Sequence, residues 1–357
     1  MVVVNYPEES NEKIVKNHSQ TITKIEEWAS NHRDKLFCCH IIDAPNLPKK
    51  FAGVGLARKI GMDEAICRFS EVNNEEGIIC GFDADATVDN NYFVSIEDHF
   101  KRYPKSPGAS IYYEHPLEPI DDNKLKIGII QYEIHLRYLV NCSRYTGFPY
   151  AFHTVGSSFA VKAKAYVKQG GMNRFKAGED FYFINKIIPL GGYTEINTTT
   201  VHPQARVSNR VPFGTGASMM KWMESDRDLF LTYQFQSFLP LKKLFSGLEN
   251  IYNKKAIHYE FVQNEVLWRF LIEGDYENAL SEILINSGSL NAFTKRFFTW
   301  FDAFKIVKYL NFASLNGYDK KPVISEANHL LSYYKKPSDF DMHNLLEIYR
   351  QWDRSGV

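Results

Sequence analysis

Carboxylates that follow an apolar run are the residues of this 357-residue sequence best suited to chemistry. Asp83 and Asp85 are separated by one residue and come directly after the run 77–82, which is typical of a buried strand. Two carboxylates at a strand end can share one hard cation, and oxygen ligands suit Mg²⁺ or Mn²⁺. The same pattern is common in surface turns, so the tripeptide alone does not decide between a metal site and a turn.

The elements that must position these acids alternate along the first half of the chain. Three apolar runs typical of strands are separated by two segments of helical periodicity, in the order 2–4, 11–31, 36–42, 53–69 and 77–82. This order predicts a doubly wound α/β sheet, in which ligands bind beyond the carboxyl ends of the strands. Asp43 and Asp83 are then expected at two of those ends.

The sequence changes character after about residue 216. Glycine becomes sparse, and apolar residues recur at three- and four-residue spacing, which predicts helices. We therefore expect a first domain over 1–215 and a smaller helical domain over 216–357. Aromatic residues make up 15% of the chain. For aromatic runs such as 297–301 we expect core packing, with a homodimer interface or contact with a membrane surface as the alternatives.

Charge and cysteine usage narrow the partners and the compartment. The 42 Lys and Arg residues balance the 42 Asp and Glu residues, which argues against a nucleic-acid binder. Five cysteines form no CxxC pair, and the chain shows neither a leader pattern nor a run of about 18 apolar residues. These features predict a cytoplasmic protein without a transmembrane segment, with peripheral contact at the inner face of a membrane left open.

Two further motifs accompany the Asp-x-Asp pair. Segment 53–61 has the form G-x-x-x-A-R-x-x-G, and Glu179-Asp180 follow a Gly-Gly turn at 170–171. Together with Asp43 and the Asp-x-Asp, in this order, these motifs resemble the family 2 glycosyltransferases of the GT-A fold over about residues 1 to 215. The resemblance implies a GT-A catalytic domain with a doubly wound mixed sheet, the fold of nucleotide-diphospho-sugar transferases.

The resemblance also implies a reaction. A sugar would pass from a UDP- or GDP-linked donor to an acceptor hydroxyl, with Mn²⁺ or Mg²⁺ neutralising the leaving diphosphate. Asp180, beside Glu179, would be the general base, although acids are also favoured at any helix N-terminus. Asp85 would bind the metal, Asp83 the ribose or the metal's water shell, and His202 would complete the coordination unless it is a structural histidine before Pro203.

Donor- and acceptor-binding residues follow from the same resemblance. The implied base pocket consists of Asp43 with Tyr6, Pro7 and Glu8, and the implied diphosphate contacts are Arg58, Ala84, Arg206 and Arg210. Arg58 could instead lie on a solvated helix face. The acceptor region is implied to contain His153, Gly156, Ser157 and Ser158, for which a buried strand with small residues is the alternative. The acceptor itself would be a glycan or a lipid-linked sugar.

Departures from the family pattern limit what is implied. Asp43-Ala44-Pro45-Asn46 stands where the family has Asp-Asp-Gly-Ser, and the Gln-x-x-Arg-Trp motif of processive membrane synthases is absent. A non-processive, inverting enzyme is therefore favoured, with a role in bacterial surface glycan or polysaccharide synthesis by family analogy. The alternatives are a retaining glycosyltransferase and a catalytically retired carbohydrate- or nucleotide-binding scaffold. A sugar-phosphate nucleotidyltransferase is disfavoured, because no Gly-rich basic loop follows the first strand.

Overall fold

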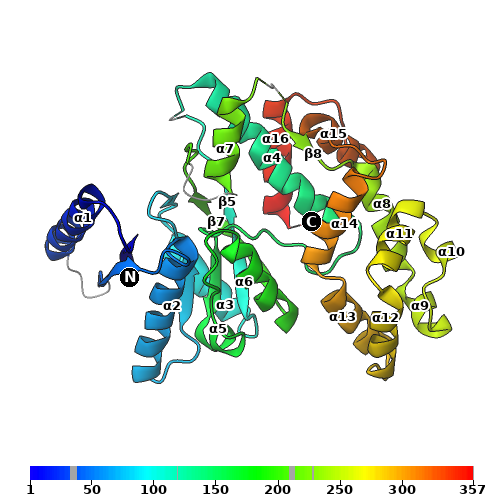
Figure 1. Cartoon of the computed structure of the whole chain (residues 1–357), viewed down its shortest axis with the longest axis horizontal. Coiled ribbons are helices and arrows are strands. Elements are labelled where there is room, and N and C mark those ends of the chain that lie inside the picture. Colours follow the sequence, from blue (N-terminus) through cyan, green and yellow to red (C-terminus); the bar gives the residue numbers. More distant parts are fainter. Residues whose placement is uncertain (33–37, 119, 209–213, 227–228, 357) are drawn as a thin grey trace. The chain divides into compact units, whose positions relative to one another are not determined.

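The computed structural model describes residues 1–32, 38–118, 120–208, 214–226 and 229–356 (Figure 1). The chain divides into two compact units, each made of two stretches of sequence. The first unit comprises Met1–Tyr113 and Thr154–Ser218, and the second comprises Glu114–His153 and Met219–Val357. The mixed α/β architecture and the helical C-terminal region agree with the prediction at this level.

A mixed five-stranded sheet forms the centre of the first unit. Its strands lie in the order β3 (Ile78–Gly81), β6 (Phe159–Lys162), β5 (Gly108–Tyr113), β7 (Thr194–His202) and β4 (Thr87–Val88). The β5 and β7 strands are parallel, and the other neighbouring pairs are antiparallel. Every residue of β5 and β6 is buried, because side chains cover both faces of these central strands.

Helices connect these strands. They are α2 (Val54–Glu71), α3 (Tyr92–Arg102), α5 (Ala163–Lys168), α6 (Glu179–Ile187) with the 3₁₀ turn η1 (Ile188–Leu190), and α7 (Thr215–Glu224) at the boundary between the units. Gly170 and Gly171 end α5 with φ of +70° and +75°, a conformation that glycine adopts without strain. The Gly-Gly turn expected at 170–171 is therefore confirmed.

The first two strands form a sheet of their own, which corrects the prediction of one continuous sheet. β1 (Val2–Pro7) pairs in parallel with β2 (Ile41–Leu47), and α1 (Glu12–Asn31) connects them. β2 begins and ends later than the predicted strand at 36–42, of which 36–37 lie outside the described residues. Asp43 consequently pairs with Val4 inside β2 rather than following its end. β2 can continue through Pro45 because it has a pairing partner on one side only.

The second unit is helical around an aromatic core. Its longest helix, α4 (Asn123–Tyr145), packs against α15 (Val323–Tyr333) and α16 (Met342–Ser355). The remaining elements are β8 (Leu231–Thr232), η2 (Phe235–Phe238), α8 (Leu239–Ser246), α9 (Leu248–Lys254), α10 (Tyr259–Val262), α11 (Glu265–Glu273), α12 (Tyr276–Ile285), α13 (Leu290–Trp300), α14 (Ala303–Ser314) and β9 (Lys321–Pro322).

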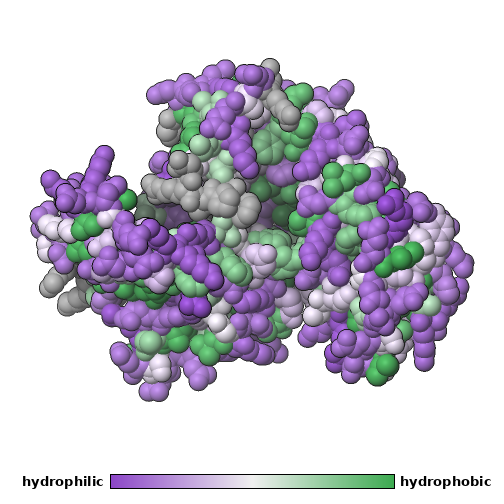
Figure 2. Space-filling model, viewed as in Figure 1, coloured by the Kyte–Doolittle hydropathy of each residue, from purple (hydrophilic) through white to green (hydrophobic). Residues whose placement is uncertain are grey.

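The aromatic run at 297–301 belongs to this core, as predicted. Phe297 and Phe301 are fully buried, and Phe298 is 5% exposed. Their rings contact one another and Phe245 at centroid distances of 5.1 to 6.3 Å, within the range of favourable aromatic pairs. On the face drawn in Figure 2, hydrophilic side chains predominate over the helices of this unit.

The unit boundary differs from the predicted one at residues 114–153. These residues were expected in the first domain, but α4 packs with the C-terminal helices because Ile130, Ile134 and Tyr138 on its surface are fully buried in the aromatic core. Within the described residues, none of the helices combines the length and the apolarity that crossing a membrane requires.

Candidate functional site

The Asp-x-Asp pair lies in a tight turn between β3 and β4, just past a strand end as predicted. The N–H of Ala86 donates to the carbonyl oxygen of Asp83 at 3.0 Å and closes the turn. Ala86 is buried, whereas the side chains of Asp83 and Asp85 remain 39% and 32% exposed. Both carboxylates are therefore accessible from solvent while their backbone is fixed.

Arg58 is the centre of a buried charge cluster, which we call the Arg58 cluster. Its side chain is only 11% exposed and donates from α2 to the carboxylates of Asp83 and Glu179. Gly156 makes room for it, since a Cβ at that position would collide with the guanidinium. Arg58 thus joins the Asp-x-Asp turn to the start of α6, and the alternative of a solvated helix face is excluded.

Glycines bring α2 close to the segment that carries the acidic pair. A Cβ at Gly55 would collide with the carbonyl oxygen of Phe175, so only glycine permits this approach. Gly178 precedes α6 with φ of +70° and turns the chain into the helix that begins at Glu179. Gly55 and Gly178 therefore bring α2 and the start of α6 together.

Burial sets the electrostatics of the acidic pair. It raises the pKa of both Glu179 and Asp180, and the positive charge of Arg58 opposes this effect only in part. Asp180 also accepts a hydrogen bond from the N–H of Phe181 at 2.7 Å. One guanidinium interacts with the carboxylates of Asp83, Glu179 and Asp180, so negative charge is in excess.

A second group of charges adjoins the turn on its β4 side. Thr87 of β4 pairs with His202 of β7. Asp85 precedes Thr87 by two residues, so this pairing brings His202 to the β4 side of the turn. Arg206 donates from Nε to Oδ2 of Asp85 at 2.9 Å. His202 Nε2 lies 2.9 Å from Oδ1 of Asp89. Burial alone would raise the pKa of Asp89, but hydrogen bonds from His202 and Thr200 lower it.

The implied metal ligands suit the metal in type, although each also has a protein partner. Asp83 pairs with Arg58, Asp85 with Arg206 and His202 with Asp89. In the described part of the chain, no three His, Cys, Asp or Glu side chains are grouped so that they could hold an ion as they stand. Two carboxylates and one imidazole on the same turn and neighbouring strand are nevertheless donors that Mn²⁺ accepts.

The residues of the implied base pocket gather on the β1–β2 pair. Asp43 Oδ1 lies 2.7 Å from Nε2 of His18 on α1, and the Tyr6 ring contacts His18 edge-on at 4.7 Å between centroids. Glu8 Oε1 accepts the N–H of Lys49 at 2.9 Å. Pro7 pairs with Leu47. Asp43 remains 59% exposed, so it is held in place by His18 but open to a ligand.

The residues of the implied acceptor region fall on both sides of a unit boundary in the sequence. Gly156 adjoins Arg58, whereas Ser157 and Ser158 are only 2% and 1% exposed in the turn before β6. His153 belongs to the second unit, where its Nε2 lies 2.9 Å from Oδ2 of Asp353. The structure thus favours the buried alternative for the two serines and pairs His153 with Asp353 of α16.

Two implied positions and two residues that were not predicted need a separate remark. Arg210 lies outside the described residues. Ala84 is exposed between the two carboxylates of the turn. Asp89 and His18 were not singled out from the sequence as site residues, since a lone acid near a helix start and a histidine on the apolar face of a helix are both ordinary. Only the β4–β7 register and the contact with Asp43 reveal them.

No protein-family model matches this chain, and no curated protein matches it significantly either.

Proposed function

We propose that this chain is a metal-dependent, inverting and non-processive glycosyltransferase with a GT-A catalytic domain. The observation that carries the proposal is the Arg58 cluster. Three motifs far apart in the sequence, on α2, after β3 and at the start of α6, meet around one guanidinium and leave carboxylates in excess. Structural ion pairs are usually balanced, whereas a surplus of buried carboxylates with raised pKa values is typical of a functional site.

The proposed donor site combines this cluster with the adjoining turn. Asp83 and Asp85, with His202, would hold Mn²⁺ or Mg²⁺, which supplies positive charge to the leaving diphosphate of the nucleotide sugar. Arg206 is 49% exposed and already pairs with Asp85, so its guanidinium could turn to a phosphate oxygen at the same place. Asp43, with Tyr6 and Glu8 on the same pair of strands, would contact the base.

Asp180 is the proposed general base. It would accept the proton of the acceptor hydroxyl while that oxygen attacks the anomeric carbon. Its raised pKa makes it a stronger base than an exposed aspartate, which suits proton removal from a hydroxyl. Glu179 is tied to Arg58 and would position the start of α6 rather than move a proton.

The experiment that tests this function measures release of UDP or GDP from a panel of nucleotide sugars, with and without Mn²⁺. We expect release that requires the metal and falls in Asp180→Asn. Asp98→Asn is the matched control, since Asp98 is an exposed aspartate on α3. No metal-dependent release with any donor would contradict the proposal. The anomeric configuration of the product, determined by NMR, tests inversion against retention.

A second candidate function is a nucleotide-binding scaffold without catalysis. It is favoured by one observation: each implied metal ligand already pairs with a protein group. Such a protein would bind the nucleotide sugar without releasing the diphosphate, so binding measured by calorimetry alongside the release assay distinguishes the two functions.

A further inference from the structure

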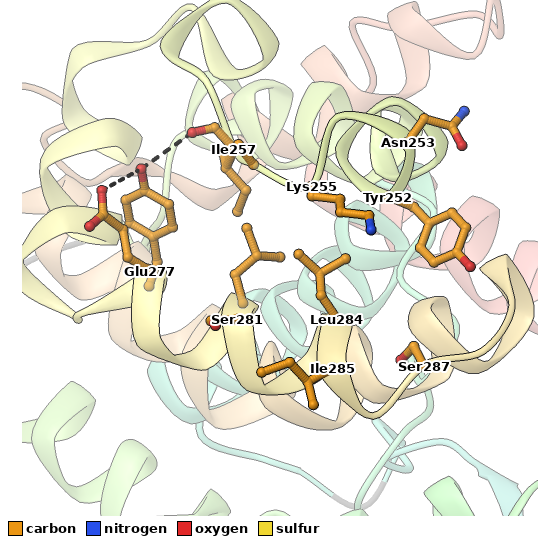
Figure 3. A pocket seen from close by; sticks show the side chains of 12 residues that line it. Tyr252, Asn253, Lys255, Ile257, Glu277, Ser281, Leu284, Ile285 and Ser287 are labelled. Atoms are coloured by element: carbon orange, nitrogen blue, oxygen red, sulfur yellow. Dashed lines mark hydrogen bonds between the residues drawn. The ribbon is translucent and has the colours of Figure 1, made fainter.

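The helical unit contains a cavity that has no part in the site described above. It lies between α9, with the loop that follows it, and α12, and its volume is about 650 Å³ (Figure 3). Small-molecule sites in proteins commonly measure about 300 to 1,000 Å³. The cavity is therefore large enough for a ligand of more than one ring.

Aliphatic side chains form one part of its wall. Leu280 and Leu284 lie one helical turn apart on α12, and Figure 3 shows Leu284 on the opposite side of the opening from Ile257. Leu280 and Ile257 are 4% and 2% exposed, whereas Ile285 at the end of α12 is 82% exposed. An apolar surface thus extends from the floor of the cavity to its rim.

Hydrogen-bonding side chains form the other part. Tyr252 and Asn253 of α9 and Ser281 of α12 can each both donate and accept. Lys255 adds a donor and Glu277 an acceptor. The hydroxyl of Tyr276 donates to the carbonyl oxygen of Ile257 at 3.2 Å, drawn in Figure 3 as the dashed line that ends at Ile257, and this bond ties the loop to α12 at one end of the cavity.

We propose that this cavity binds an uncharged saccharide chain. A sugar ring presents apolar C–H faces together with hydroxyls that donate and accept, and the wall offers aliphatic surface, a tyrosine ring and three side chains of matching capacity. A phosphate group would meet one cation, Lys255, together with the negative charge of the Glu277 carboxylate, so the lining does not favour an anion. A hydrocarbon chain would match only the aliphatic part of the wall and would leave its hydrogen-bonding side chains unused.

Naming this saccharide as the acceptor glycan of the enzyme rests on the proposed function, but the binding itself does not. Binding is therefore measured without donor or metal, so that failure of the transferase assay leaves the result interpretable.

The test is a saturation-transfer NMR titration of the full chain with tetrasaccharides of glucose, galactose, mannose and N-acetylglucosamine. We expect at least one to bind the wild type, and Ser281→Phe, which fills the cavity, to weaken that binding about tenfold or more. Glu282→Phe is the matched control, because Glu282 is an exposed neighbour on α12 that does not line the cavity, and its Kd should stay within about twofold of wild type.

Asn253→Ala provides a second variant, since it removes an exposed side chain that lines the cavity. It should also weaken saccharide binding while the melting temperature stays unchanged. The proposal is overturned if no tetrasaccharide binds the wild type, or if Ser281→Phe and Asn253→Ala both bind like the wild type. Binding of farnesyl phosphate that depends on Ser281 while the saccharides fail to bind would overturn it as well.

Discussion

Two buried charge clusters in this chain differ in how their charges balance. In the Arg58 cluster of the first unit, a single guanidinium interacts with the carboxylates of Asp83, Glu179 and Asp180. The second cluster, in the helical unit, is centred on Arg137 and includes His115, Glu133, His153, Arg350 and Asp353; we call it the Arg137 cluster. It joins α4 to α16 and matches each carboxylate with several cationic or polar groups.

The geometry of the Arg137 cluster is that of a satisfied network. Arg137 donates to Oδ2 of Asp353 at 2.6 Å and to Oε1 of Glu133 at 2.8 Å, and Arg350 donates to the same Glu133 oxygen at 2.8 Å. Burial alone would raise the pKa of Glu133 and of Asp353, but the cations around them lower it. In the Arg58 cluster burial prevails and the pKa of Asp180 is raised.

The charge balance of a cluster indicates whether it can still accept a ligand. A balanced buried network is already complete, and it holds a structure in one arrangement. A cluster with excess carboxylates can be stabilised by a bound cation, or one of its carboxylates can take up a proton. Such a cluster can therefore take part in binding and catalysis. The Arg137 cluster also holds His115 and His153 in place. These histidines lie near the two ends of the segment 114–153, which belongs to the second unit although it lies in sequence between the two stretches of the first.

The largest expected effect separates the clusters by activity. We expect Asp180→Asn to lower turnover about 10²- to 10⁴-fold, because it removes a general base, while the free energy of unfolding does not fall. Steady-state nucleotide release and urea unfolding of the same preparation measure both. A variant with wild-type turnover would remove Asp180 from the reaction.

The second prediction distinguishes the two clusters by their contribution to the free energy of unfolding. Glu133→Gln should lower the free energy of unfolding by about 3 to 5 kcal/mol, because it leaves buried guanidinium groups without their carboxylate. Glu347→Gln, which alters a carboxylate that is 60% exposed beside Arg350, should change it by less than about 1 kcal/mol. Urea unfolding followed by tryptophan fluorescence reports mainly on the helical unit, which contains Trp222, Trp268, Trp300 and Trp352. Equal effects of the two variants would show that the network is not structural.

A glycine substitution tests whether the position of Arg58 matters. Gly156→Ala forces a methyl group against the guanidinium, and we expect a loss of about 1 to 3 kcal/mol in stability, with weaker nucleotide binding. Gly288→Ala is the control, since a Cβ there meets open space. Thermal melting and calorimetric titration with UDP and GDP check both effects. If nucleotide binding were unchanged in Gly156→Ala, Arg58 would not support the donor site.

The smallest effect concerns pH, and its sign differs between the clusters. Because the folded-state pKa of Asp353 is lowered, its stabilising effect is complete above the ordinary aspartate pKa and is lost as the pH falls through the folded value. Asp180 has a raised pKa, so its contribution to stability declines as the pH rises between its ordinary and its raised value.

Urea unfolding below about pH 4 measures this difference. The slope of the unfolding free energy against pH should become shallower in Asp353→Asn, by at most about 1.4 kcal/mol per pH unit, which corresponds to one proton. Asp180→Asn should leave this acid slope in place. If Asp180→Asn changed the acid slope and Asp353→Asn did not, the roles given to the two clusters would have to be exchanged.

Local patterns explain why part of the fold could be predicted. The glycine pair at 170–171 ends a helix by adopting positive φ angles, and short polar side chains accept backbone N–H groups at helix starts, as Asp122, Ser289, Asp302 and Asp341 do. The strand before Asp83 could also be predicted, because a continuous apolar run bounded by turn residues is typical of a buried strand.

Pairing and packing decided what these patterns could not. Periodicity does not state which strand is the neighbour of which, so the separate β1–β2 sheet and the place of Asp43 within β2 were not predictable. The apolar face of a helix does not indicate which core the helix packs against. The packing of α4 in the aromatic core of the second unit was therefore not predictable.

The order of the acidic and glycine motifs and the concentration of aromatic residues in the helical part can be read directly from the chain, because composition and spacing are local properties. That Arg58, Asp83 and Glu179 meet, and that the charges around Arg137 balance, follows from the folded arrangement. Charge balance depends on distances between residues far apart in the chain, and those distances exist only once the chain has folded.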